Sequence, residues 1–127
     1  MAGGAREAVF TPLRLSRLAD DLENDAAAVN YAAAFLELLP IRTESLLSAV
    51  SEGRLAAARD TVLSLRVRSH MVGGLAMEQS CLALEGHLSD GDNSSAATAA
   101  ERVAQESDAL RLALEEYLRK QRGHPSR

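Results

Sequence analysis

The chain has 127 residues, 46% of them hydrophobic, which suits a single domain with one core. Its net charge of −4 gives no electrostatic support for nucleic-acid binding, and its single cysteine excludes an intrachain disulfide. No apolar run is long enough to span a membrane, and residues 1–7 lack the apolar centre of a signal peptide. We therefore expect a cytoplasmic protein that binds neither membranes nor nucleic acid.

With no tryptophan and few aromatic, glycine or proline residues, the composition favours an all-helical chain whose core is filled by leucine, valine and alanine. Residues 1–10 are predicted to be a flexible tail, although Phe10 is a candidate for docking. Thr11 and Pro12 are a good N-cap and first residue for a short helix that ends near Asn24. Its predicted apolar stripe consists of Leu15, Leu18 and Leu22.

The second predicted helix is capped by Asn24 and ends at Glu52, before Gly53. Pro40 interrupts it, and a proline inside a helix removes a hydrogen bond and costs ~3 kcal/mol or more. Because the apolar period resumes after Pro40, we expect one bent helix rather than two. Its apolar positions are Val29, Ala32, Phe35, Leu36, Leu39, Leu46, Leu47 and Val50.

The third predicted helix, Arg54 to Val72, carries two parallel rows of side chains. The row with bundle-core spacing is Leu55, Ala58, Val62, Leu65, Ser69 and Val72. The second row is Arg59, Leu63, Arg66, Val67 and His70. Leu63 follows Val62 directly and is rotated ~100° from the core row. We therefore expect Leu63 and Val67 to be at least partly exposed.

Gly73 and Gly74 predict a tight turn into a fourth helix, Leu75 to about Leu88, and a polar turn at 89–94 separates it from a fifth helix, Ser95 to Lys120. The inward positions are Met77, Cys81, Leu84 and Leu88, then Ala99, Val103, Leu110, Leu114 and Tyr117. Residues 122–127 are a predicted flexible tail. The predicted fold is an all-α antiparallel four-helix bundle over 11–121, with a short additional N-terminal helix.

The turn sequence Val72-Gly73-Gly74-x-x-Met77-x-x-x-Cys81-x-x-Leu84-Glu85 resembles histidine-containing phosphotransfer (HPt) domains, whose pattern is Leu-Gly-Ala-x-x-Leu-x-x-x-Cys-x-x-Leu-Glu. In that family His-x-x-Lys-Gly precedes the turn, with the phosphorylated histidine ten residues before the turn glycine. Here those positions hold Leu63, Arg66 and Val67. The resemblance covers about residues 12–120 and includes the segment from Phe35 to Pro40.

The resemblance implies the scaffold of a phosphotransfer protein without its phosphoryl acceptor. Leucine has no lone pair, so Leu63 cannot act as a nucleophile. Val67 adds bulk where a partner would approach, and Arg66 keeps the positive charge with a different geometry. The leading hypothesis is an HPt-like protein-binding module without enzymatic activity. It would engage a response-regulator receiver domain or a histidine kinase through the second row of the third helix.

His70 supports an alternative hypothesis, an active histidine phosphotransfer protein of a phosphorelay. It lies about two turns beyond Leu63, and His70-x-x-Gly73-Gly74 imitates the family motif locally. The simpler interpretation is a surface histidine near a helix C-terminus, where a positive charge suits the helix dipole. The cluster of Arg59, Arg66 and Arg68 is open to two interpretations, solubility or complementarity to an acidic receiver pocket.

A third hypothesis is a small helical-bundle enzyme or ligand carrier, which no pocket residue supports. Cys81 and His87 do not have metal-ligand spacing with a third ligand, so we expect neither a metal nor a cofactor. The chain is expected to be a monomer or a weak homodimer.

Overall fold

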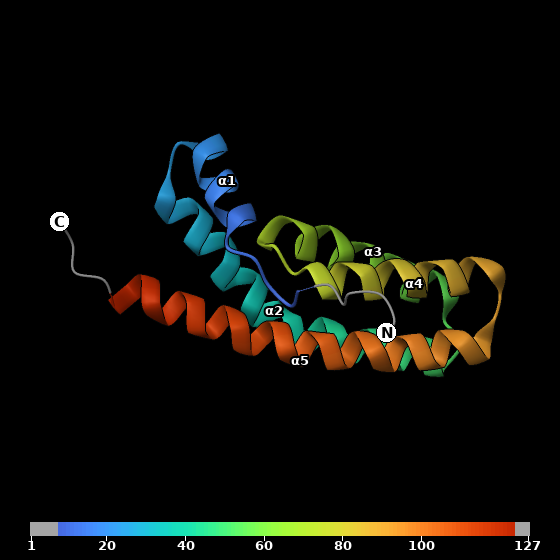
Figure 1. The fold of residues 1–127 in the computed structure, drawn as a ribbon. Helices are drawn as coiled ribbons and strands as arrows, with labels where there is room; N and C mark the ends of the chain where they lie inside the picture. Colours follow the sequence, from blue (N-terminus) through green and yellow to red (C-terminus); the bar gives the residue numbers. More distant parts are fainter. Residues whose placement is uncertain (1–7, 124–127) are drawn as a thin grey trace, which may run out of the picture.

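The computed structural model describes residues 8–123, and this part of the chain forms five α-helices and no strand (Figure 1). The helices are α1 (Leu13–Leu22), α2 (Asp25–Ser51), α3 (Leu55–Val72), α4 (Leu75–Asp90) and α5 (Asn93–Gly123). Both α2 and α4 pack against α3 and α5, so the four long helices enclose one core, and α1 packs on α2 and α3. The predicted all-α four-helix bundle with an additional N-terminal helix is confirmed.

Pro40 lies inside α2 and does not end it, as the resumed apolar period predicted. The helix is one element from Asp25 to Ser51, and Figure 1 shows that its direction changes along its length. The Oδ1 atom of Asn24 accepts a hydrogen bond from the backbone N–H of Ala27 at 3.1 Å, which confirms the predicted cap. Pro40 is exposed, so its ring faces solvent rather than the core.

The core is built from the inward row of each helix, and the rows predicted for α3 after Leu55 and for α4 are correct. On α2 the predicted Val29, Leu36, Leu47 and Val50 are only partly buried, and the buried Ala28, Thr43 and Ala49 were not predicted. Phe35, Leu39, Leu65, Met77 and Leu110 are each at most 2% exposed. One polar pair crosses this core, because the Thr43 and Ser107 hydroxyls lie 3.0 Å apart between α2 and α5. A buried hydroxyl needs such a partner to offset its lost hydration.

The ends of the predicted rows are less accurate than their centres. Leu55 and Leu22 were predicted to face the core but are 44% and 51% exposed, because each lies at a helix end where no neighbouring helix covers it. On α5, the predicted Ala99 and Tyr117 are only partly buried and flank the core. The buried positions of α1 and α5 that the prediction missed are Ala19, Ala96, Ala100, Ser107 and Leu118.

The loop before α5 is shorter than the predicted turn at 89–94, since α4 ends at Asp90 and α5 begins at Asn93. The Asp92 carboxylate accepts a hydrogen bond from the backbone N–H of Ser95 at 3.0 Å, which caps the new helix. Hydrogen bonds from Ser95 lower the pKa of Asp92. At the other end, Arg122 and Gly123, expected in a tail, belong to α5, and residues 124–127 lie outside the described residues.

Residues 8–10 were expected in a flexible tail, but they pack on the bundle. The Ala8 carbonyl accepts from the N–H of Ala76 at 2.9 Å, and the N–H of Thr11 donates to the Gly73 carbonyl at 2.9 Å. The Phe10 ring meets the Tyr117 ring edge-on, with ring centroids 5.4 Å apart. The segment thereby ties the turn between α3 and α4 to α5, while residues 1–7 lie outside the described residues.

Candidate functional site

The second row of α3 faces away from the core, as its helical spacing predicted. Leu63 is 45% exposed and Val67 is 47% exposed, while Val62, directly before Leu63, and Leu65, between Leu63 and Val67, are fully buried. A step of one position along α3 therefore takes an apolar side chain from the core to the surface. Exposed apolar side chains are common individually, so the significance of this pair depends on its neighbours.

Arg66 lies at the edge of α3 that packs on α4, and a carboxylate already neutralises it. Its Nε atom is 2.5 Å from Oε1 of Glu85, and both side chains are about two-thirds or more buried. The remaining arginines do not gather around it. Arg59 donates to the carbonyl of Leu88 at 3.4 Å, and Arg68 donates to the Ser64 hydroxyl within α3. The predicted cluster of three arginines is therefore divided between two flanks of the helix.

His70 lies in the last turn of α3, and its ring nitrogen Nδ1 contacts two oppositely charged groups. Nδ1 is 2.9 Å from Oε2 of Glu78 and 2.8 Å from Nη1 of Arg14. Arg14 also donates to the His70 carbonyl at 3.0 Å. Because Nδ1 carries either a proton or a lone pair, it can donate to Glu78 or accept from Arg14, but it cannot do both at once. The cluster links α1 to the hairpin of α3 and α4.

Leu82 is the residue of this surface that the sequence analysis missed. It is 42% exposed and lies on α4 between Glu78 and Glu85, the two residues that reach across to α3. The antiparallel pairing set by these contacts places Leu82 opposite Val67. Leu82 follows the inward Cys81 just as Leu63 follows Val62, so the same spacing argument would have found it. Its neighbours on α3 follow only from the packing of the two helices.

Three exposed apolar side chains, the Arg66–Glu85 ion pair and the contact between His70 and Glu78 therefore form one surface across two helices. We call it the α3–α4 face and define it by Leu63, Val67 and Leu82, together with the pairs Arg66–Glu85 and His70–Glu78. An apolar centre with a polar border is the usual composition of a protein-docking site. Among the predicted site residues, Leu63, Arg66, Val67 and His70 belong to this face, and Arg59 lies beside it.

The cysteine and the second histidine of α4 do not form a reactive pair. Cys81 is fully buried, and this burial, reinforced by the negative charge of Glu85 and opposed by Arg66, raises the pKa of its thiol to about 12. Cys81 is thus a protonated core residue at neutral pH. Within residues 8–123, no group of three or more histidine, cysteine or acidic side chains is arranged to hold a metal ion.

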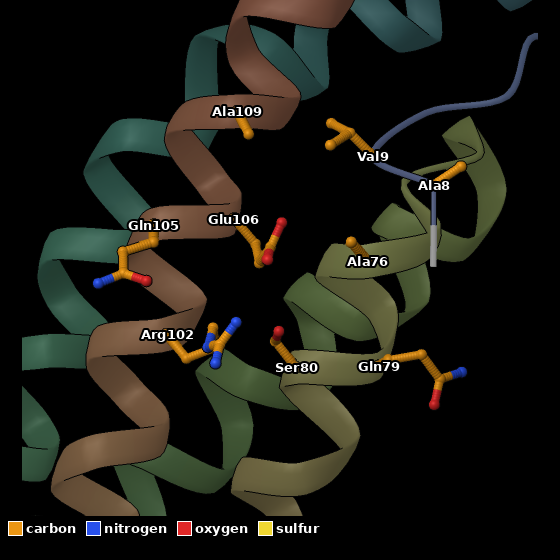
Figure 2. A pocket seen from close by; sticks show the side chains of 9 residues that line it. All are labelled: Ala8, Val9, Ala76, Gln79, Ser80, Arg102, Gln105, Glu106 and Ala109. Carbon is orange, nitrogen blue, oxygen red and sulfur yellow. The ribbon is translucent and has the colours of Figure 1, made fainter. Parts of the chain in front are cut away.

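A pocket of about 670 Å³ opens on the other side of α4, between α4, α5 and residues 8 and 9 (Figure 2). Arg102 of α5 points across it toward Ser80 of α4, and Glu106 of α5 points into it on the side of Ala76. No residue of the α3–α4 face lines this pocket. No helix in the described part of the chain has the length and apolar character to cross a membrane.

No protein-family model matches this chain, and no curated protein sequence matches it. One solved structure does, the crystal structure of histidine-containing phosphotransfer protein B (HptB) from Pseudomonas aeruginosa PAO1. The match has a TM-score of 0.78 at 20% sequence identity, and it covers 88% of this chain and 96% of the other. At this identity the likeness concerns the fold, which is therefore HPt-like.

Proposed function

We propose that this protein is an HPt-like binding module of two-component signalling that docks a receiver domain or a histidine kinase without transferring a phosphoryl group. The observation that carries the proposal is Leu63. It lies at the position where the resemblance expects the acceptor histidine, it is exposed, and it has no nucleophilic atom. A phosphotransfer scaffold with leucine at this position keeps a surface that can bind a partner, but it has no atom there that can accept a phosphoryl group.

The surroundings of Leu63 support docking. Val67 and Leu82 extend the apolar area over two helices, and the charged groups beside them are already paired. Burial of this area under a partner would favour binding, because each Å² of apolar surface removed from water contributes roughly 25 cal/mol to the binding free energy. The partner would be a protein of the same signalling system, since the fold is that of proteins that meet receivers and kinases.

The direct test measures binding and transfer separately. Purified receiver domains and kinase domains encoded in the same genome are passed over the immobilised protein, and binding of at least one in the micromolar range is expected. The same receivers, charged with labelled acetyl phosphate, are expected to leave no acid-labile label on the protein. Failure of every domain of both kinds to bind would contradict the proposal.

A second candidate is phosphotransfer through His70, because its Nδ1 lies 2.9 Å from the Glu78 carboxylate and its ring is exposed. A carboxylate that holds the proton on Nδ1 leaves the lone pair of Nε2 open to attack phosphorus. Arg14 competes for the same Nδ1 atom and disfavours that tautomer. Acid-labile label that disappears in His70→Gln and persists in His87→Gln would favour this candidate over the first.

A further inference from the structure

The side chain of His70 meets a cation and a carboxylate at the same ring atom. Nδ1 lies 2.8 Å from Nη1 of Arg14 on α1 and 2.9 Å from Oε2 of Glu78 on α4. The guanidinium can only donate, so its contact requires a lone pair on Nδ1, whereas the contact with the carboxylate requires a proton there. The contact with Arg14 therefore needs a neutral imidazole with its proton on Nε2, and only the contact with Glu78 suits the doubly protonated imidazolium.

A rotation of the His70 ring does not relieve this conflict. The same Nη1 atom of Arg14 lies 3.4 Å from Nε2, and it also donates to the His70 carbonyl at 3.0 Å. Both ring nitrogens of an imidazolium carry a proton, so either one presents an N–H group to the guanidinium. Protonation therefore opposes two donors and two positive charges at short range, which favours departure of Arg14 from the ring.

The charges around His70 come from three helices. In the described part of the chain they are Arg14, Arg17 and Asp21 of α1, Glu78 of α4 and, one turn earlier on α3, Arg66. Arg17 and Asp21 line a cavity of about 320 Å³ together with His70 and carry opposite charges. The charge of Arg66 is opposed by Glu85. The balance is therefore set by Arg14, which opposes a positive ring, and by Glu78, which attracts one.

Few side chains hold the first turn of α1 to the bundle. Only Leu15 and Ala19 of this helix are buried, and its N-cap, Pro12, makes no side-chain capping hydrogen bond. Among the described residues, Arg14 alone joins α1 to another helix through side-chain hydrogen bonds. Loss of its contact with the His70 ring therefore weakens the attachment of α1, while the attraction of Glu78, 3.9 Å from Arg14, limits the movement.

We propose that His70 is a pH-sensitive switch for α1. When the ring takes a second proton from solvent, Nδ1 donates to Glu78, Arg14 moves away, and the first turn of α1 loosens from the hairpin of α3 and α4. Solvent reaches the ring, since the side chain is 53% exposed, and imidazole is the side chain that changes charge between about pH 5 and 8. The switch goes beyond the proposed function, because it needs no partner. It also adds a positive charge to one end of the α3–α4 face.

Hydrogen exchange of the full chain, corrected at each pH for the intrinsic exchange rate, tests the switch. Between pH 7.5 and pH 5.5 the protection factors of the α1 amides should fall about fivefold, while those of α2 and α5 stay constant. His70→Gln, which keeps a polar side chain that cannot take the proton, should remove this pH dependence. Arg14→Gln should loosen α1 at both pH values, with little further change between them. The matched control is His87→Gln, at the histidine of α4, which should respond like the wild type.

Each other outcome counts against the switch. Protection of α1 that does not change with pH in the wild type, or that changes equally in His70→Gln, would refute it. A fall shared by α2 and α5 would show a loss of global stability instead. An unaltered pH response in Arg14→Gln would mean that Arg14 is not the group displaced, which also overturns the proposal. Because no binding partner enters the experiment, its result is independent of the binding screen.

Discussion

At the scale of single residues, two leucines of α3 lie in different environments. Leu63 and Leu65 are two residues apart on α3, yet one is 45% exposed and the other fully buried. A substitution at Leu65 changes core packing, whereas a substitution at Leu63 changes only what the surface offers to a partner. A leucine at such an exposed position offers no nucleophilic atom and takes no part in the core.

Leu63→Glu is expected to leave the free energy of unfolding within ~0.5 kcal/mol of the wild type, because the side chain is exposed and Arg59 and Arg66 lie on adjacent turns. Binding should weaken by ~2 kcal/mol or more, the loss typical of a hot spot. Urea titration and binding of the same preparation measure the two effects. Leu112→Glu, at an exposed leucine of α5, is the control and should change neither. A large drop in stability would mean that Leu63 belongs to the core.

At the scale of the elements, the turn between α3 and α4 holds the N-terminal segment. Gly73 ends α3 with a left-handed φ of 88°, and its carbonyl accepts from Thr11 at 2.9 Å. The backbone of Thr11 approaches so closely that a Cβ atom on Gly73 would collide with its carbonyl oxygen. The segment before α1 can pack here only because residue 73 is glycine.

Gly73→Ala is therefore expected to destabilise the protein by ~3 kcal/mol, through backbone strain and displacement of the Thr11 backbone. The matched variant is Gly91→Ala, which also has a positive φ but no neighbour within 4 Å, and it should cost only ~1 kcal/mol. Chemical denaturation gives both values. In Gly73→Ala, the backbone amide hydrogens of α1 should exchange faster with solvent, while those of the four bundle helices stay protected. Equal losses in the two variants would mean that the contact with Thr11 contributes nothing.

At the scale of the whole molecule, the bundle depends on a core of leucine, valine and alanine with one buried thiol. The pKa of Cys81 rises from 9.0 to about 12, chiefly because burial disfavours the thiolate. A folded-state pKa above the unfolded value contributes stability that is complete below the unfolded pKa and is lost as pH rises. Unfolding is thus coupled to deprotonation of Cys81 in alkaline solution.

Between pH 8 and pH 10 we expect the free energy of unfolding to fall by roughly 1 kcal/mol through Cys81 alone, since one pKa unit corresponds to ~1.4 kcal/mol. Tyr117, whose pKa is also raised by burial, contributes in the same direction. Urea unfolding at each pH measures the total, and Cys81→Ala isolates the thiol because it keeps Tyr117. Identical pH dependence in the two proteins would contradict a buried, protonated thiol.

The sequence by itself determined the helices, the single bent α2 and the exposure of Leu63 and Val67. These features depend on local spacing, on caps and on glycine breaks, which are written in consecutive residues. Prediction failed at the helix ends, as with Leu22 and Leu55, because exposure there depends on whether another element extends far enough to cover the residue.

Only the tertiary structure decided what lies beside the α3 row. The sequence identified Arg66 as a positive charge of the second α3 row, but its partner Glu85 comes from the neighbouring helix. Leu82 was placed opposite Val67 by the antiparallel register, and Arg14 was brought to His70 by the packing of α1. Helical periodicity fixes the direction of a side chain relative to its own axis. The residues it meets depend on the packing of separate helices, which no local pattern specifies.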